Sequence, residues 1–165
     1  MAFDTYVDLS PTIEGEATAK GFEKKIEIFS FSWGASAPVT VGPGKGGLNA
    51  SRVSISSFNV MKKTDVASPK LFKACCTGET IKTCLVSLRK QTGAGGQEVF
   101  LTYKFEEVMV ESVQWSGSSG GDDTPSESVS FAFAKVTVEY KTQDKTGKLA
   151  AGTPVVWDIT AVSAA

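Results

Sequence analysis

The sequence predicts a mainly β protein: a single β-barrel of two packed antiparallel sheets over residues 1–165, with one short α-helix and a long extended loop. Composition is the first reason, because valine outnumbers leucine by 17 to 7 and serine and threonine are abundant. Such β-branched residues favour strands over helices. Periodicity is the second reason, since seven runs of the chain alternate with a period of two. Seven or so strands in one chain of this length fit a single barrel or sandwich domain.

The alternating runs give the expected strands in chain order. They are Phe3–Leu9, Ile26–Trp33, Arg52–Met61, Ile81–Lys90, Glu98–Trp115, Ser128–Tyr140 and Val155–Val162. The second run places small hydroxyl residues and aromatic residues on opposite faces, with Ile26, Ile28, Ser30 and Ser32 on one and Glu27, Phe29, Phe31 and Trp33 on the other. The aromatic face indicates core packing, and the serine face indicates contact with water.

The sixth run changes its apolar phase partway along. Phe131 and Phe133 share one phase, whereas Val136 and Val138 share the other. Because Phe133 and Val136 are an odd number of residues apart, a regular strand cannot place both pairs on the same face. We therefore expect a bulge or corner near Ala134–Lys135.

One short helix is expected after the third strand. Ser68 is expected to cap its start, Pro69 to occupy the first helical position, and Gly78 to end it. Its apolar stripe should cover one open end or side of the barrel, with Lys70 and Lys73 facing water. The residues of that stripe are Leu71, Phe72, Cys75 and Cys76.

Composition excludes several classes of function. The chain has no histidine, which removes Ser-His-Asp and Cys-His catalysis, histidine-ligated zinc and histidine-based pH switching. Its 17 basic and 18 acidic residues give a net charge of −1, which argues against nucleic-acid binding. Its three cysteines, Cys75, Cys76 and Cys84, show no CxxC spacing and are expected to be buried reduced thiols. We expect no catalytic residues, no metal ligands and no cofactor, and therefore no enzyme.

The chain also lacks the signals of membrane insertion and of a secretory leader. No unbroken apolar run approaches the ~18 residues that span a bilayer. The first residues, Met1 to Tyr6, have no basic segment followed by an apolar stretch. We expect synthesis in the cytoplasm without a signal peptide and no membrane insertion.

Two segments imitate catalytic or nucleotide-binding motifs. The glycine-rich stretch around Lys45 fails as a phosphate-binding loop, because Gly46 stands where that motif needs serine or threonine. Adjacent carboxylates such as Glu106–Glu107 point to opposite faces of a strand, so a hydrolytic pair is the weakest hypothesis. A long loop inside a small domain is often functional, which favours a docking role for the glycine-rich stretch.

Short motifs follow one another in a fixed order over nearly the whole chain. They are Gly15-Glu16, Ile26 to Gly34, Ala67 to Phe72, Ala74-Cys75, Thr77-Gly78, Leu88-Arg89-Lys90, Gly117 to Asp123, Glu127-Ser128-Val129, Phe133-Ala134-Lys135 and Trp157-Asp158. Together they resemble the hemolysin-coregulated proteins, the tube subunits of type VI secretion. The resemblance implies a β-barrel with one short helix that forms a homohexameric ring, with rings stacked into a hollow tube. It also implies a contractile sheath around the tube, a spike protein at its tip, small effector proteins in its lumen, and secretion through the type VI apparatus.

The resemblance and the strand pattern together suggest two surfaces. The ring-stacking contact is expected on the long loop, formed by Val41, Gly42, Pro43, Gly44, Lys45, Gly46, Gly47, Leu48, Asn49, Ala50 and Ser51. The lumen and its cargo contact are expected on the serine face, at Ser30, Ser32, Ser54 and Ser56. A monomeric β-barrel that binds a small ligand is the alternative, and it would need an apolar cavity of a few hundred Å³.

Overall fold

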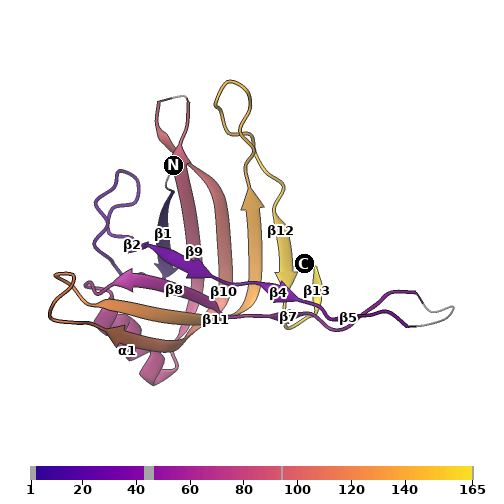
Figure 1. The fold of residues 1–165 in the computed structure, drawn as a ribbon, viewed down its shortest axis with the longest axis horizontal. Coiled ribbons are helices and arrows are strands. Elements are labelled where there is room, and N and C mark those ends of the chain that lie inside the picture. Colours follow the sequence, from indigo (N-terminus) through magenta and orange to yellow (C-terminus); the bar gives the residue numbers. More distant parts are fainter. Residues whose placement is uncertain (1–2, 43–46, 94, 165) are drawn as a thin grey trace.

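The fold is one bent antiparallel sheet that nearly closes into a barrel, with a thin arm projecting from one side (Figure 1). The computed structural model describes residues 3–42, 47–93 and 95–164. Nine strands form the sheet in the order β13-β12-β11-β10-β9-β1-β2, with β8 also paired to β11 and β3 to β8. Two further ladders, β4–β7 and β5–β6, form the arm. The predicted mainly β barrel with one helix is confirmed.

The elements have the following bounds. The strands are β1 (Asp4–Ser10), β2 (Ile26–Ile28), β3 (Ser30–Ser32), β4 (Ala35–Ser36), β5 (Val39–Thr40), β6 (Asn49–Ala50), β7 (Ser54–Ile55), β8 (Phe58–Lys63), β9 (Thr80–Gln91), β10 (Gln97–Ser116), β11 (Ser126–Tyr140), β12 (Val155–Asp158) and β13 (Ser163–Ala164). The helix is α1 (Ser68–Thr77).

The two expected sheets are two halves of one sheet, because β10 and β11 run through both. Strand β11 pairs with β8 along residues 126–131 and with β12 along residues 135–138. Figure 1 shows β8 and the first half of β11 crossing the foot of the upright parts of β9 and β10. The register places Glu107 opposite Ala134, and Glu107 has a positive φ of 53°. The corner predicted near Ala134–Lys135 is therefore confirmed. A further register shift, between Val110 and Ser112, was not predicted.

The run from Ile26 to Trp33 is wrong as a single strand. It breaks at Phe29, because β2 pairs with β1 whereas β3 pairs with β8. The change of partner also changes the phase, so Ile26 and Ile28 are buried. Phe29, which was expected in the core, is 60% exposed.

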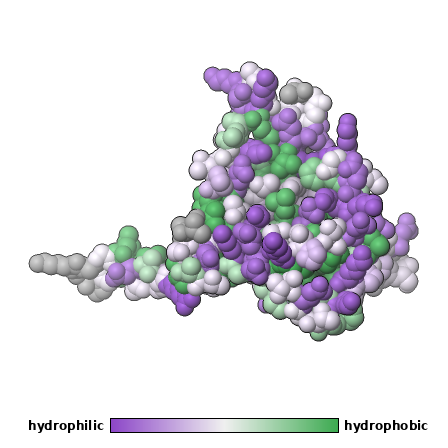
Figure 2. Space-filling view, turned by 180° about the vertical axis from the view of Figure 1, so that it is seen from behind, coloured by the Kyte–Doolittle hydropathy of each residue, from purple (hydrophilic) through white to green (hydrophobic). Residues whose placement is uncertain are grey.

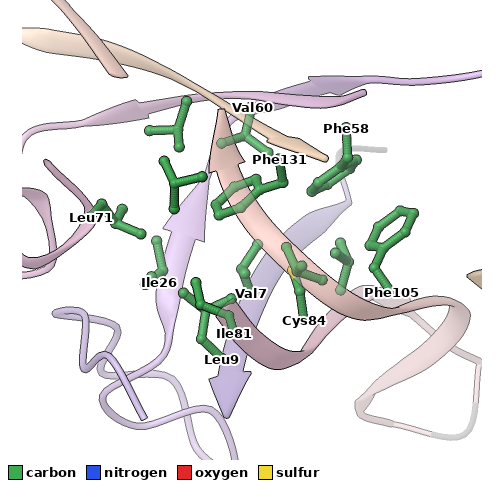
Figure 3. Packing of buried hydrophobic residues seen from close by; sticks show 14 of the residues in the cluster. Val7, Leu9, Ile26, Phe58, Val60, Leu71, Ile81, Cys84, Phe105 and Phe131 are labelled. Carbon is green, nitrogen blue, oxygen red and sulfur yellow. The ribbon is translucent and has the colours of Figure 1, made fainter. Parts of the chain in front are cut away.

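Aliphatic and aromatic side chains from both halves of the sheet fill the space between them (Figure 3). Phe58 and Phe105 are fully buried with ring centroids 4.8 Å apart, and Phe133 lies 4.4 Å from Phe105. Trp33 packs edge-on against Phe105. Aromatic pairs at these separations are stabilising beyond the area that they bury. The expectation that Phe31, Trp33 and Phe133 pack against a filled core is confirmed.

Helix α1 packs on β10 and closes one side of the core. Leu71 and Ala74 are its buried apolar residues, and Cys75 is half-buried. Gly78 ends the helix in the left-handed conformation with φ 66°, as predicted. Lys70 and Lys73 are exposed, also as predicted.

Two details of the helix prediction are wrong. The N-cap is Ala67 and not Ser68, because the Asp65 carboxylate accepts the backbone N–H of Ala67 while Ser68 lies inside the first turn. The apolar stripe is rotated, so Phe72 and Cys76 are exposed. Phe72 instead packs at a tilt against the ring of Trp115, with centroids 5.4 Å apart.

The cysteines are free thiols in three environments. Cys84 is buried, and this burial raises the pKa of its thiol. Cys75 is half-buried and Cys76 is exposed, so the expectation of three buried thiols is wrong for Cys76.

An ion pair lies in the interior where α1 meets the sheet. Lys62 and Glu127 have side chains 1% and 0% exposed, with 2.6 Å between Nζ and Oε1. The Lys62 ammonium also donates to Asp65 and to the Ser68 hydroxyl. The Trp115 indole donates to the second oxygen of Glu127 at 2.6 Å. Each charge is therefore satisfied by several partners, as burial requires.

Candidate functional site

Small polar side chains gather on one face of the sheet, opposite the core. Ser32 stands opposite Asn59 on β8, and Asn59 stands opposite Ser130 on β11. Ser130 in turn stands opposite Ser112 on β10. Residues that are directly opposite in a sheet project to the same side. We call this surface the hydroxyl face; its small polar residues are Ser30, Ser32, Asn59, Ser112, Ser128 and Ser130, and the partly exposed Met61 stands on the same side between Ser30 and Ser128.

The other side of the same strands faces the core. Phe31 stands opposite Val60, and Val60 stands opposite Val129, each one residue away from the hydroxyl face. Val60 and Val129 are buried, whereas Ser30 and Ser32 are exposed. One strand set therefore separates a dry interior from a polar surface. The exposure of Ser30 and Ser32 agrees with the expectation that their side of the strand contacts water.

Hydrogen bonds connect the hydroxyl face and its border. The Ser130 hydroxyl donates to the side-chain oxygen Oδ1 of Asn59, and the side-chain amide of Asn59 donates to the backbone oxygen of Ser57 at 3.1 Å. Ser57 donates to the Glu111 carboxylate. These hydrogen bonds tie Ser130 to Asn59 and connect the bordering Ser57 to the Glu111 carboxylate.

The structure brings together only two of the four serines expected on this face. Ser54 lies on β7, opposite Ser36 of the arm. The Ser56 hydroxyl accepts the N–H of Gly34 at 2.8 Å and donates to the carbonyl of Gly34 at 3.2 Å. Ser56 therefore links the two chain segments at the base of the arm through Gly34. Neither Ser54 nor Ser56 pairs with a residue of the hydroxyl face.

Sequence reasoning missed four members of the hydroxyl face. The signal was present, because Asn59, Ser128 and Ser130 alternate with buried Val60 and Val129. The sequence assigns each of these runs to a strand from its apolar residues, without showing which strands are neighbours. The polar residues form one surface only because β8 pairs with β11 and β11 pairs with β10.

The long loop expected at residues 41–51 forms the outer part of the arm. We call residues 35–42 and 47–55 the arm, and its strands pair only with one another. Figures 1 and 2 show it standing clear of the barrel. Its outermost described apolar residues, Val41 and Leu48, are each 74% exposed. Pro43, Gly44, Lys45 and Gly46 lie outside the described residues.

An open apolar groove lies between the arm root and β12. It has a volume of about 300 Å³, and Trp33, Val53, Val138 and Trp157 contribute to its walls. The indole N–H of Trp157 is buried without a hydrogen-bond partner among the described residues. The groove lies outside the filled core, so it is not the interior cavity of a ligand-binding barrel.

Ionisable groups elsewhere show local perturbations. A hydrogen bond from Thr160 lowers the pKa of Asp158, with further donors from the backbone of residues 160 and 161. Burial raises the pKa of Tyr6, opposed by the Arg89 guanidinium beside it. Across the described residues, no three acidic or cysteine side chains lie close enough together to hold a metal ion. The same part of the chain contains no helix with the length and apolarity needed to cross a membrane.

Because its core is filled, this β-barrel can contact other molecules only through its surface, where the hydroxyl face and the arm are prominent features. A family sequence model described as the type VI secretion system effector Hcp matches residues 5–140. The chain therefore belongs to the Hcp family of type VI secretion proteins. The family resemblance drawn from the sequence motifs is thereby confirmed.

Individual relatives agree with this assignment. Protein hcp1 of Pseudomonas aeruginosa is 32% identical over 147 residues, which are 89% of this chain and 88% of that protein. A solved structure of a type six secretion system protein is 37% identical, with a TM-score of 0.91 over 99% of this chain and 100% of the other. Hcp1 from Salmonella typhimurium is 27% identical, with a TM-score of 0.78 over 100% of both chains.

Proposed function

We propose that this chain is the tube subunit of a type VI secretion apparatus. Six copies close into a ring, and rings stack into a hollow tube that a contracting sheath drives out of the cell behind a spike protein. The chain is made in the cytoplasm, leaves through this apparatus, and performs no catalysis. The observation that supports this most is the hydroxyl face, whose small polar side chains are suited to lining a water-filled lumen while the opposite face packs the core.

The arm is the proposed stacking contact. It exposes Val41 and Leu48, and among the described residues its strands pair only with one another. A two-stranded ribbon on its own is marginally stable in water, so the arm gains order by lying on another copy. A contact between two different surfaces of identical chains closes into a ring or continues as a filament, depending on its rotation. The tube needs one contact that closes six copies into a ring and a second contact that stacks one ring on the next.

The test of this function is the assembly state of the purified protein. Native mass spectrometry is expected to show hexamers, and negative-stain microscopy at high concentration is expected to show stacked rings. Deleting residues 42–47 should leave the hexamers and reduce the stacking. A protein that stays monomeric at every concentration up to tens of micromolar contradicts the tube function, and undiminished stacking after the deletion contradicts the role of the loop.

The lumen assignment has its own test. Replacing Ser32 by arginine places a long cation on the exposed hydroxyl face, away from the core, so folding and ring formation should be unchanged. Retention of small effector proteins, measured by co-purification from the producing bacterium, should fall. Ser54→Arg, on the arm, is the matched control. Normal retention by the Ser32 variant removes this face from the cargo contact.

The alternative of a monomeric small-ligand barrel has one observation in its favour, the apolar groove beside Trp157. Its volume of about 300 Å³ is at the lower end for ligand pockets. If that function holds, the protein is monomeric and an environment-sensitive apolar dye binds to it, and Val138→Arg abolishes the binding. Hexamers without dye binding exclude this alternative.

A further inference from the structure

We propose that an acidic groove at the far end of β8 receives the arm of a second copy of this chain, an inference that rests on the proposed tube function. The groove has a volume of about 400 Å³ and lies between the loop at Glu16, the end of β2 and the end of β8. Its walls include Glu27, Phe29 and Lys63. The groove thus combines carboxylates with the exposed ring of Phe29.

The groove carries an excess of negative charge. Lys63 already pairs with Asp122 at 3.6 Å, and Asp65 is held by the buried Lys62 at 2.7 Å. Glu16 and Glu27 are exposed and have no ion-pair partner among the described residues. Two carboxylates therefore remain available to a cation from outside.

The arm has the complementary composition. The chain contains no acidic residue between Glu27 and Asp65, a stretch that includes the whole arm. Arg52 is the exposed cation on the described part of the arm. Val41 and Leu48 provide apolar surface of the kind that packs on an aromatic ring such as Phe29. Charge complementarity of this kind fixes the register of a contact and speeds its formation.

A copy cannot place its own arm in its own groove. Strand β8 begins at Phe58, directly after the arm, and ends at Lys63, on the groove wall. Its six residues span about 20 Å. Figure 1 shows the arm leaving the barrel in the direction away from the end of β8. The occupant is therefore the arm of another copy, which makes the contact heterologous.

Charge reversal followed by mixing tests this pairing. A groove variant carries Glu16→Lys with Glu27→Lys, and an arm variant carries Arg52→Glu. Each alone brings like charges together, so each should need about tenfold more protein than the wild type to assemble. In an equimolar mixture, the native arm of the groove variant meets the native groove of the arm variant, and the reversed arm meets the reversed groove. The mixture should therefore assemble at close to the wild-type concentration.

Assembly is followed by sedimentation velocity and negative-stain microscopy, at low and high salt. Glu98→Lys, an exposed change at the β9–β10 hairpin, is the control and should assemble as the wild type does. Circular dichroism confirms that every variant is folded. A groove variant that assembles normally overturns the inference, and so does a mixture no better than its separate components, because a different segment then occupies the groove.

The outcomes separate this inference from the proposed function. A wild-type protein that forms no rings contradicts the tube function itself. Wild-type tubes together with unaffected charge variants contradict only the groove. Loss of tubes with rings intact, restored on mixing, supports both the groove and the stacking role of the arm. If the rings themselves are lost and mixing restores them, the arm does bind the groove, but the two copies in contact belong to the same ring and not to stacked rings.

Discussion

Replacing Lys62 by methionine is expected to lower the free energy of unfolding by about 3–5 kcal/mol. Lys62 is 1% exposed, and its ammonium group neutralises Glu127, which is fully buried 2.6 Å away. Methionine fills a similar volume but leaves the Glu127 carboxylate in the interior with the Trp115 indole as its remaining donor. Removing one partner of a buried pair is costly because the other charge stays desolvated. Urea unfolding at a fixed protein concentration measures the loss.

Two further variants identify the cause of that loss. Lys63→Met, one residue along, removes an exposed lysine that is 3.6 Å from Asp122 and should change stability by at most about 1 kcal/mol. Adding Glu127→Gln to the Lys62 variant removes the unpaired charge and should recover about half of the loss or more. The buried pair is not a stability determinant if Lys62→Met and Lys63→Met unfold at the same urea concentration.

Replacing Phe105 by alanine is expected to cost about 3–5 kcal/mol of folding free energy. The Phe105 ring is fully buried and lies among Phe58, Phe133 and Trp33, with centroid separations of 4.8, 4.4 and 5.4 Å. Its removal leaves a cavity where both halves of the sheet meet, and rigid neighbouring strands limit collapse into it. Thermal unfolding and the near-ultraviolet circular dichroism of the aromatic cluster report the change.

The matched control is Phe29→Ala, since Phe29 is the same residue type but 60% exposed. It should change stability by about 0.5 kcal/mol or less. Equal destabilisation by the two substitutions would contradict the assignment of Phe105 to the core and Phe29 to the surface.

The fold could be predicted because its long strands carry their own periodicity. Residues 128–140 alternate clearly enough to reveal even the corner opposite Glu107. The break at Phe29 could not be predicted, because it arises from a change of pairing partner and not from a change in local pattern. The two-residue strands of the arm are too short to carry any period.

The candidate site was predictable only in part, for a related reason. Ser30 and Ser32 were identifiable because large aromatic residues alternate with them. Asn59 and Ser130 become part of the same surface only through the pairing of β8 with β11, which single-strand patterns do not encode. Lys62 and Glu127 alternate in step with the buried apolar residues of their strands. A charged residue at such a position is a sequence signal that it has a partner in the interior.

The two strands that continue through the corner have a mechanical consequence. From Leu101 opposite Tyr140 to Ser116 opposite Ser126, β10 and β11 remain antiparallel partners across both halves of the barrel. Backbone hydrogen bonds lie across the strand direction, so a pull along these strands loads many of them in shear at once instead of opening them one by one. A subunit built in this way resists force along β10 and β11 as a unit, a property that suits the proposed tube.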